Sequence, residues 1–129
     1  MRVGIDLVSV NRIAGSLAEF GDRFMHKLFT ADEIAYAVAA PELTAQRLAA
    51  RFAAKEAAIK ALGLGGDRAV DFREIEVRRA GDGAVALALH GATGRHAASL
   101  GVDAVALSFS HEGDLATAIV VATTKREPT

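Results

Sequence analysis

Two carboxylates and one lysine are the side chains of this sequence best suited to chemistry. Asp6 lies between Ile5 and Leu7 near the end of a predicted strand, where an unpaired carboxylate is costly. Glu56 and Lys60 are spaced i,i+4 in a predicted helix, so their side chains meet. A strand aspartate and a helix glutamate together suit Mg²⁺, which takes oxygen ligands and keeps waters or substrate phosphates. The plainer alternatives are a capping or ion-paired Asp6 and an ordinary surface pair on the helix.

A second set of residues favours anion binding. Lys55 falls inside the apolar arc of the same helix, although a lysine there can also extend its stem along apolar neighbours. Ser110 and His111 stand where a predicted strand enters a turn, and a protonated histidine at that place would bind a phosphate well. A turn histidine is, however, most often only solvated. Gly63 and Gly65 belong to a flexible connection just after the helix.

The helix that carries Glu56 and Lys60 is the element around which the chain is organised. The stretch over 48–63 lacks proline and inner glycine, is rich in alanine, and ends at a glycine suited to a left-handed C-terminal cap. Its larger apolar residues share one arc, the predicted core face: Leu48, Phe52, Ile59 and Leu62. Its small residues line another side, where a neighbouring element can come close: Ala50, Ala53, Ala57 and Ala61. Arg51 is expected on the polar flank of the apolar arc.

The remaining segments complete an α+β pattern, with helices bunched early and antiparallel strands late. The expected elements are, in order, a strand over 2–8, helices over 10–20, 22–28 and from 30 to the break before 41, the long helix from about 44, strands over 73–79 and 84–89, a helix over 92–100, and strands over 102–110 and 115–123. The last four strands form two hairpins. We expect a single domain over 1–124 and a flexible tail over 125–129.

Composition excludes several classes of function. The 129 residues suffice for one domain with a hydrophobic core, and the absence of cysteine excludes disulfides, thiolate metal sites and a cysteine nucleophile. A net charge of −1 argues against a general nucleic-acid binder. Asp6 interrupts the apolar run that a signal peptide needs, and no stretch of about 18 apolar residues occurs. We therefore expect a cytoplasmic protein that binds neither nucleic acid nor membrane.

Three segments together resemble the holo-acyl-carrier-protein synthase family: GIDL at 4–7, RFAAKEAAIKALG at 51–63 and SFSHE at 108–112. Their order and spacing agree with that family over nearly the whole chain. The resemblance implies a 4′-phosphopantetheinyl transferase-like fold, with an antiparallel sheet packed on a long central helix. It implies transfer of the 4′-phosphopantetheine arm from coenzyme A to a serine of an apo-acyl carrier protein, leaving adenosine 3′,5′-bisphosphate. It also implies a homotrimer with each active site at a subunit interface.

The resemblance also implies roles for individual residues. Asp6 and Glu56 would be the catalytic carboxylates and Mg²⁺ ligands, and Lys60 would contact the pyrophosphate. His111, with Ser110, would sit beside that pyrophosphate from the neighbouring subunit.

Lys55 and the loop with Gly63 and Gly65 would lie close to coenzyme A. The acyl carrier protein is expected to be acidic and to dock near a group of basic residues on the early helices: Arg12, Arg23 and Lys27. Glu19 and Asp22 interrupt this basic group.

The sequence leaves the proton acceptor for the attacking serine open, between Glu56 itself and a metal-bound water. Two rival functions also remain at this stage. A metal-dependent phosphoesterase would use the same two carboxylates but would want more acidic ligands. A non-catalytic binding or assembly domain would keep the fold with a dead site, although the three motifs are intact.

Overall fold

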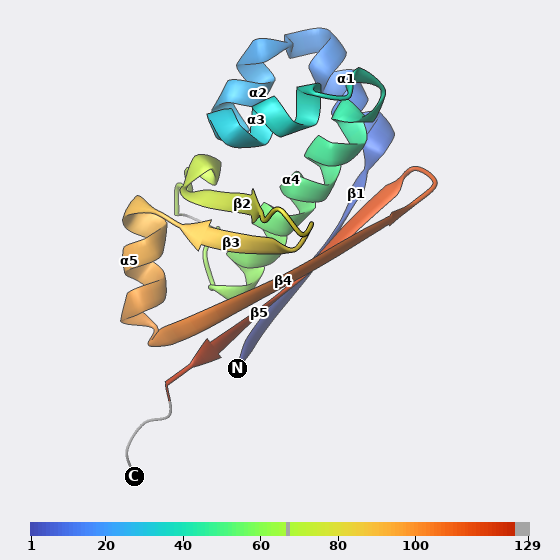
Figure 1. The fold of residues 1–129 in the computed structure, drawn as a ribbon. Helices are drawn as coiled ribbons and strands as arrows, with labels where there is room; N and C mark the ends of the chain where they lie inside the picture. The colour runs from blue at the N-terminus through green and yellow to red at the C-terminus, as the bar shows by residue number, and fades with distance from the viewer. Residues whose placement is uncertain (67, 126–129) are drawn as a thin grey trace.

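The protein is described by a computed structural model that covers residues 1–66 and 68–125. Its elements run in the order β1 (Arg2–Ser9), α1 (Val10–Phe20), α2 (Asp22–Leu28), α3 (Ala31–Val38), α4 (Thr44–Ala61), β2 (Ile75–Arg79), β3 (Val85–Leu89), α5 (Gly91–Ser99), β4 (Val102–Glu112) and β5 (Leu115–Thr124), with 3₁₀ turns at Pro41–Leu43 and Phe72–Glu74. The long helix α4 passes through the middle of the molecule, and α1, α2 and α3 gather at one of its ends (Figure 1). The predicted α+β architecture is thus confirmed.

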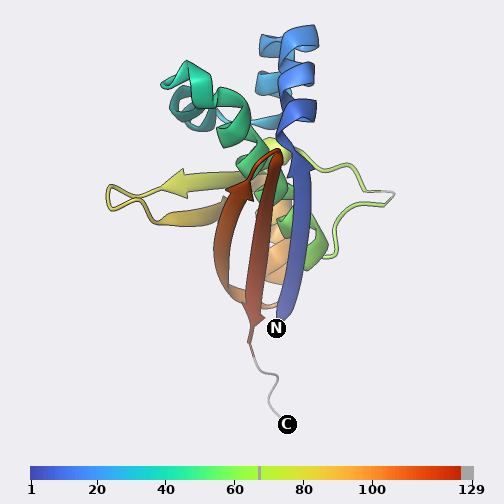
Figure 2. The same cartoon turned by 90° about the vertical axis from the view of Figure 1, so that its right-hand side faces the viewer.

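The strands form two separate antiparallel sheets. The larger sheet has the order β1-β5-β4, and the smaller one consists of the hairpin β2-β3 alone. The first strand therefore pairs with the last one, and Asp6 lies opposite Ala118 in that pairing. The sequence predicts both hairpins but not this long-range partner of β1. One face of the larger sheet packs on α4, and its other face is not covered by any described part of the chain (Figure 2).

Helix α4 forms the core through a nearly continuous run of buried small residues. Most of its alanines are fully buried, and they join side chains of β2 and β5 in one apolar cluster. The other end of α4 packs with α1, α2 and α3 in a second cluster around Leu48 and Phe29. Leu48, Ile59 and Leu62 are buried as predicted, whereas Phe52 is only half-buried and stacks on Phe72 at a ring distance of 5.6 Å.

The observed boundaries differ from the predicted ones mainly at strand ends. Residues 72–74 form a 3₁₀ turn before β2, where Asp71 caps the turn by accepting a hydrogen bond from the Arg73 amide. Strand β4 continues through Glu112, two residues further than predicted. Within the described residues, no helix is long and apolar enough to cross a membrane. Of the predicted tail only Lys125 is described; residues 126–129 lie outside the described part of the chain.

Candidate active site

Strand β1 brings Asp6 against the long helix through a very close contact. Gly4 is buried on the α4 side of β1, and a Cβ atom there would overlap the carbonyl oxygen of Ala57 and lie 2.8 Å from the Ala61 amide nitrogen. Only glycine therefore permits this approach. Because side chains alternate along a strand, Asp6 points to the same side as Gly4, toward α4. The small-residue side of the helix is thus the side where a neighbouring element comes close, as predicted.

On the helix, Lys60 meets Asp6 directly. Its Nζ donates to Asp6 Oδ1 at 3.0 Å and to the Ile5 carbonyl oxygen at 2.9 Å. The Asp6 side chain is 20% exposed and that of Lys60 is 54% exposed, so both remain open to a ligand. A pair this accessible adds little to stability. Its geometry is better explained by function than by folding.

Glu56 and Asp6 line one groove of about 380 Å³ between β1, α1, α2 and α4. The pKa of Glu56 is raised, first by its burial and second by the negative charge of Asp6, whereas Lys60 lowers it. Asp6 and Glu56 are the two acidic side chains that line this groove, and a cation bound there would relieve their repulsion. The structure therefore brings together the two predicted metal ligands and the predicted phosphate-binding lysine.

The donor set of this groove fits Mg²⁺. The ion prefers oxygen ligands and is usually held by one or two carboxylates, with waters and substrate phosphates completing its shell. Asp6 and Glu56 offer such a pair, and the groove leaves room for the other ligands. No group of three or more histidine, cysteine, aspartate or glutamate side chains within residues 1–66 and 68–125 forms an alternative metal site.

Lys55, predicted to lie close to coenzyme A, does not line this groove. Its side chain is fully buried, and its Nζ donates to Glu33 Oε1 at 2.8 Å and to the carbonyl oxygens of Phe72 and Ile75 at 2.9 and 2.6 Å. Burial lowers the pKa of Lys55, and Glu33 opposes that shift. All three protons of the ammonium group are therefore already used inside the protein.

The other predicted ligand contacts lie away from the carboxylate groove of the same chain. Ser110 and His111 line a separate hollow of about 360 Å³ at the end of β4, and His111 Nε2 lies 3.0 Å from Gln46 Nε2. Gly63 and Gly65 follow α4 with positive φ angles of 66° and 99°, which favour glycine. These residues do not form one site with Asp6 within a single chain.

The three predicted docking residues line the carboxylate groove or a second hollow. Arg12 lies on the groove itself. Arg23 and Lys27 are exposed on α2 and line an apolar hollow of about 380 Å³ together with aromatic and aliphatic side chains. We call Arg23, Lys27 and the neighbouring Phe20 and Phe24 the docking patch. Its position beside the groove agrees with the prediction, while its role is not tested by the structure.

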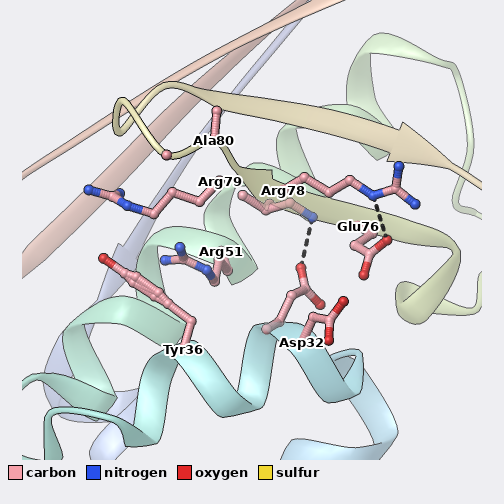
Figure 3. Close-up of a pocket in the computed structure, with 10 residues that line it drawn as sticks. Asp32, Tyr36, Arg51, Glu76, Arg78, Arg79 and Ala80 are labelled. Atoms are coloured by element: carbon pink, nitrogen blue, oxygen red, sulfur yellow. Dashed lines mark hydrogen bonds and ion pairs between the residues drawn. The ribbon is translucent and has the colours of Figure 1, made fainter.

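A pocket that the sequence analysis missed contains a cluster of arginines. It has a volume of about 580 Å³ and lies between α3, α4 and the β2-β3 hairpin (Figure 3). Arg51 and Arg79 line this pocket, with their guanidinium groups 4.5 and 5.1 Å from the centre of the Tyr36 ring. Arg47 is not in the lining but lies against the same ring at 4.1 Å. We call these four residues the arginine pocket.

Arg51 in this pocket is only 3% exposed, contrary to the predicted polar flank. Burial lowers its pKa, Tyr36 and Glu33 oppose that shift, and the nearby Arg79 and Arg47 add to it. Within the described residues none of the three arginines forms an ion pair with a carboxylate. The guanidinium groups of this pocket can donate to a phosphate, although Asp32, Glu33 and Glu76 line the same pocket. The i,i+4 spacing of Arg47 and Arg51 was the available sequence signal.

Comparisons with known proteins agree with this geometry. The model of the 4′-phosphopantetheinyl transferase superfamily matches residues 2–120. The holo-[acyl-carrier-protein] synthase of Solibacter usitatus is 42% identical over 118 residues, covering 92% of this chain and 94% of that protein. The protein of the same name from Carboxydothermus hydrogenoformans is 47% identical with the same two coverages.

Solved structures show the same likeness. The crystal structure of holo-[acyl-carrier-protein] synthase from Neisseria meningitidis has a TM-score of 0.85 at 35% identity, covering 95% of this chain and 98% of that one. The Chronobacterium ammoniagenes ACPS–CoA complex has a TM-score of 0.84 at 36% identity, covering 97% and 98%. Because both sequence and fold agree over almost the full length, this chain belongs to the holo-acyl-carrier-protein synthase family of the 4′-phosphopantetheinyl transferase superfamily.

Proposed function

We propose that this protein transfers the 4′-phosphopantetheine group from coenzyme A to a serine of an apo-acyl carrier protein, releasing adenosine 3′,5′-bisphosphate. The observation that carries the proposal is that Asp6 and Glu56 line one open groove and that Lys60 binds Asp6 directly. The name of the matched relatives and the coenzyme A complex of a structural neighbour support it.

The groove supplies what phosphoryl transfer chiefly needs, which is alignment and neutralisation of charge. Asp6 and Glu56 would hold Mg²⁺ against the pyrophosphate, where the ion would offset charge developing on the leaving phosphate. Lys60, held at the rim by Asp6 and the Ile5 carbonyl, would donate to a pyrophosphate oxygen. The attacking hydroxyl comes from the carrier protein, so this chain needs no nucleophile of its own.

The arginine pocket is suited to the other end of coenzyme A. Its three guanidinium groups surround an aromatic ring and lack carboxylate partners among the described residues. Arginine is the side chain best matched to phosphate, and aromatic or guanidinium planes suit a base. We therefore assign the phosphorylated adenosine end to this pocket and the pyrophosphate to the carboxylate groove.

A homotrimer would join these separated parts. The uncovered face of the β1-β5-β4 sheet exposes apolar side chains in a row: Val3, Ile5, Leu7, Leu115 and Ile119. Exposed apolar side chains gathered on one sheet face are typical of an interface. The hollow with Ser110 and His111 is also lined by Leu7 and Leu115, at the edge of that face. Assembly through this face would place the two residues of one chain beside the groove of the next.

We assign the docking patch to the carrier protein. It combines exposed cations with apolar side chains and adjoins the groove, since Phe24 and Leu28 line both hollows. We expect Arg23→Glu and Lys27→Glu to raise KM for the carrier about tenfold, because reversed charges repel an acidic partner. Arg95→Glu, an exposed arginine on α5, is the matched control and is expected to leave that KM unchanged.

A cytoplasmic location is also part of the proposal, and it rests on the sequence alone.

The test of the function is the mass gain of an apo-carrier incubated with the protein, coenzyme A and Mg²⁺. The wild type should add one phosphopantetheine arm, whereas Asp6→Ala and Glu56→Ala should add none although circular dichroism shows that both variants are folded. Glu42→Ala, which removes an exposed acid outside the groove, should behave as the wild type. Phosphate release without a mass gain would instead indicate a phosphoesterase, and carrier binding without either product would indicate a non-catalytic domain.

A further inference from the structure

The buried ion pair of Lys55 and Glu33 has no part in the proposed chemistry. Both side chains are fully buried, and their polar atoms are saturated by neighbours inside the protein. Lys55 binds the carbonyl oxygens of Phe72 and Ile75 in addition to Glu33. The pair is therefore tied to main-chain atoms just before and at the start of β2.

Glu33 extends this connection along the same strand. Its Oε2 accepts from the Val77 amide at 2.9 Å, and its Oε1 accepts from the Thr30 amide at 2.8 Å, which completes the capping box of α3. A single carboxylate thus joins the first turn of α3 to the middle of β2. Together with Lys55 it links three elements, α3, α4 and β2, through main-chain hydrogen bonds.

The links from Lys55 and Glu33 add to the burial of Ile75 and Val77 in holding the register of β2. This strand pairs only with β3, and their two-stranded sheet is separate from the larger sheet. A strand that slips by one residue turns every side chain to its opposite face. For β2 such a slip would turn Arg79 away from Tyr36, and the remaining hairpin residues would no longer form the wall of the arginine pocket.

We propose that Lys55 and Glu33 are positioning residues for coenzyme A. They hold the β2-β3 hairpin against α4 in the register that places Arg79 and Arg51 beside Tyr36, and they thereby set the affinity for the phosphorylated adenosine end. The inference rests on the proposed function, and it gives the first lysine of the RFAAKEAAIK segment a role without substrate contact. A buried ion pair is weak evidence for stability alone, so its use in fixing one arrangement is the better explanation.

The test separates positioning from stability. We would compare Lys55→Met, Glu33→Gln and the charge-neutral double variant Lys55→Met/Glu33→Gln with the wild type. Leu48→Ala is the matched control, because Leu48 is fully buried on α4 in the cluster with Phe29 but lines none of the described pockets. The double variant leaves no unpaired buried charge, so it stays measurable if a single variant fails to fold. Each folded variant is assayed below its melting temperature.

The readouts are kcat, KM for coenzyme A, KM for the carrier, and the calorimetric Kd of adenosine 3′,5′-bisphosphate. We expect the pair variants to raise KM for coenzyme A and this Kd about tenfold to 100-fold, because a shift of the pocket wall misplaces the guanidinium groups. KM for the carrier should stay within about twofold of the wild type. Leu48→Ala should lower the melting temperature without changing either constant.

Two results would overturn the inference. One is an unchanged KM and Kd in the folded double variant, or a change that Leu48→Ala reproduces. The other is a loss of kcat with KM for coenzyme A and the Kd of the bisphosphate unchanged, which would mean that Lys55 acts in the chemical step. If the wild type binds the bisphosphate but transfers nothing to the carrier, the proposed function fails, and the Kd comparison still decides the positioning role.

Discussion

At the scale of single residues, Lys60 is the cation of the carboxylate groove. Its ammonium is fixed by Asp6 and the Ile5 carbonyl, yet the side chain remains half exposed. We expect Lys60→Ala to lower kcat/KM about 100-fold or more, because a pre-positioned charge beside a developing phosphate contributes several kcal/mol to the transition state. Steady-state transfer kinetics measure this loss. Arg95→Ala is the control for removing an exposed cation. Equal rates in both variants would show that Lys60 does not act on the phosphate.

The charge of Glu56 lowers the stability of the folded state, although the proposed function needs that charge. Its folded-state pKa is raised above the ordinary value of 4.5, first by burial and then by Asp6. Ionised Glu56 therefore destabilises the fold above the raised pKa, and this penalty is lost as the pH falls through that pKa toward the unfolded value. We expect Glu56→Gln to abolish transfer but to raise the melting temperature at pH 7 in EDTA.

The same substitution carries its own internal control. At a pH well below the ordinary glutamate pKa, about pH 3, the glutamate is protonated in both states, so the melting temperatures of Glu56→Gln and the wild type should converge. Differential scanning calorimetry over that pH range measures the difference. A gain of equal size at both ends of the range would mean that packing, and not ionisation, causes it.

At the scale of elements, the contact of β1 with α4 is what assembles the site. Gly4→Ala would place a methyl group on the Ala57 carbonyl and push β1 away from the helix that carries Glu56 and Lys60. We expect a loss of about 1–3 kcal/mol in the free energy of unfolding, measured in urea, and a fall in transfer rate larger than this destabilisation explains. Gly15→Ala on α1 has open space around its new methyl group and should stabilise by about 0.5–1 kcal/mol with normal activity. Full activity in Gly4→Ala would show that the close contact is dispensable.

The elements also show what local sequence can and cannot predict. The helix, its small-residue side and the Thr30 capping box follow from short-range rules and are confirmed. The partner on that side, β1, depends on a pairing between opposite ends of the chain, which no local pattern specifies. The buried ion pair of Lys55 was not predicted for the same reason, since its carboxylate partner Glu33 lies 22 residues away. From the sequence, Asp6, Glu56 and Lys60 could be assigned to one site only through the resemblance to a family.

At the scale of the whole molecule, the parts of the site are divided over different surfaces. The arginine pocket shares no lining residue with the carboxylate groove, and the hollow with His111 shares only Leu7 with that groove. A coenzyme with a pyrophosphate in its middle and a phosphate at one end needs more than one such surface. In the proposed trimer, the apolar sheet face beside the His111 hollow would bring a second copy to the site.

The trimer is tested by placing a charge on that face. Ile119, in the middle of β5, is 40% exposed among the other apolar side chains of the sheet. Ile119→Lys should bring like charges together at the interface and prevent assembly, since a buried unpaired charge is strongly unfavourable. Light scattering should then give the mass of one chain, and transfer should be lost although circular dichroism shows a folded protein. Val38→Lys introduces the same charge at an equally exposed apolar residue of α3 and should leave a trimer with normal activity. A wild type that is monomeric and fully active would place the whole site within one chain.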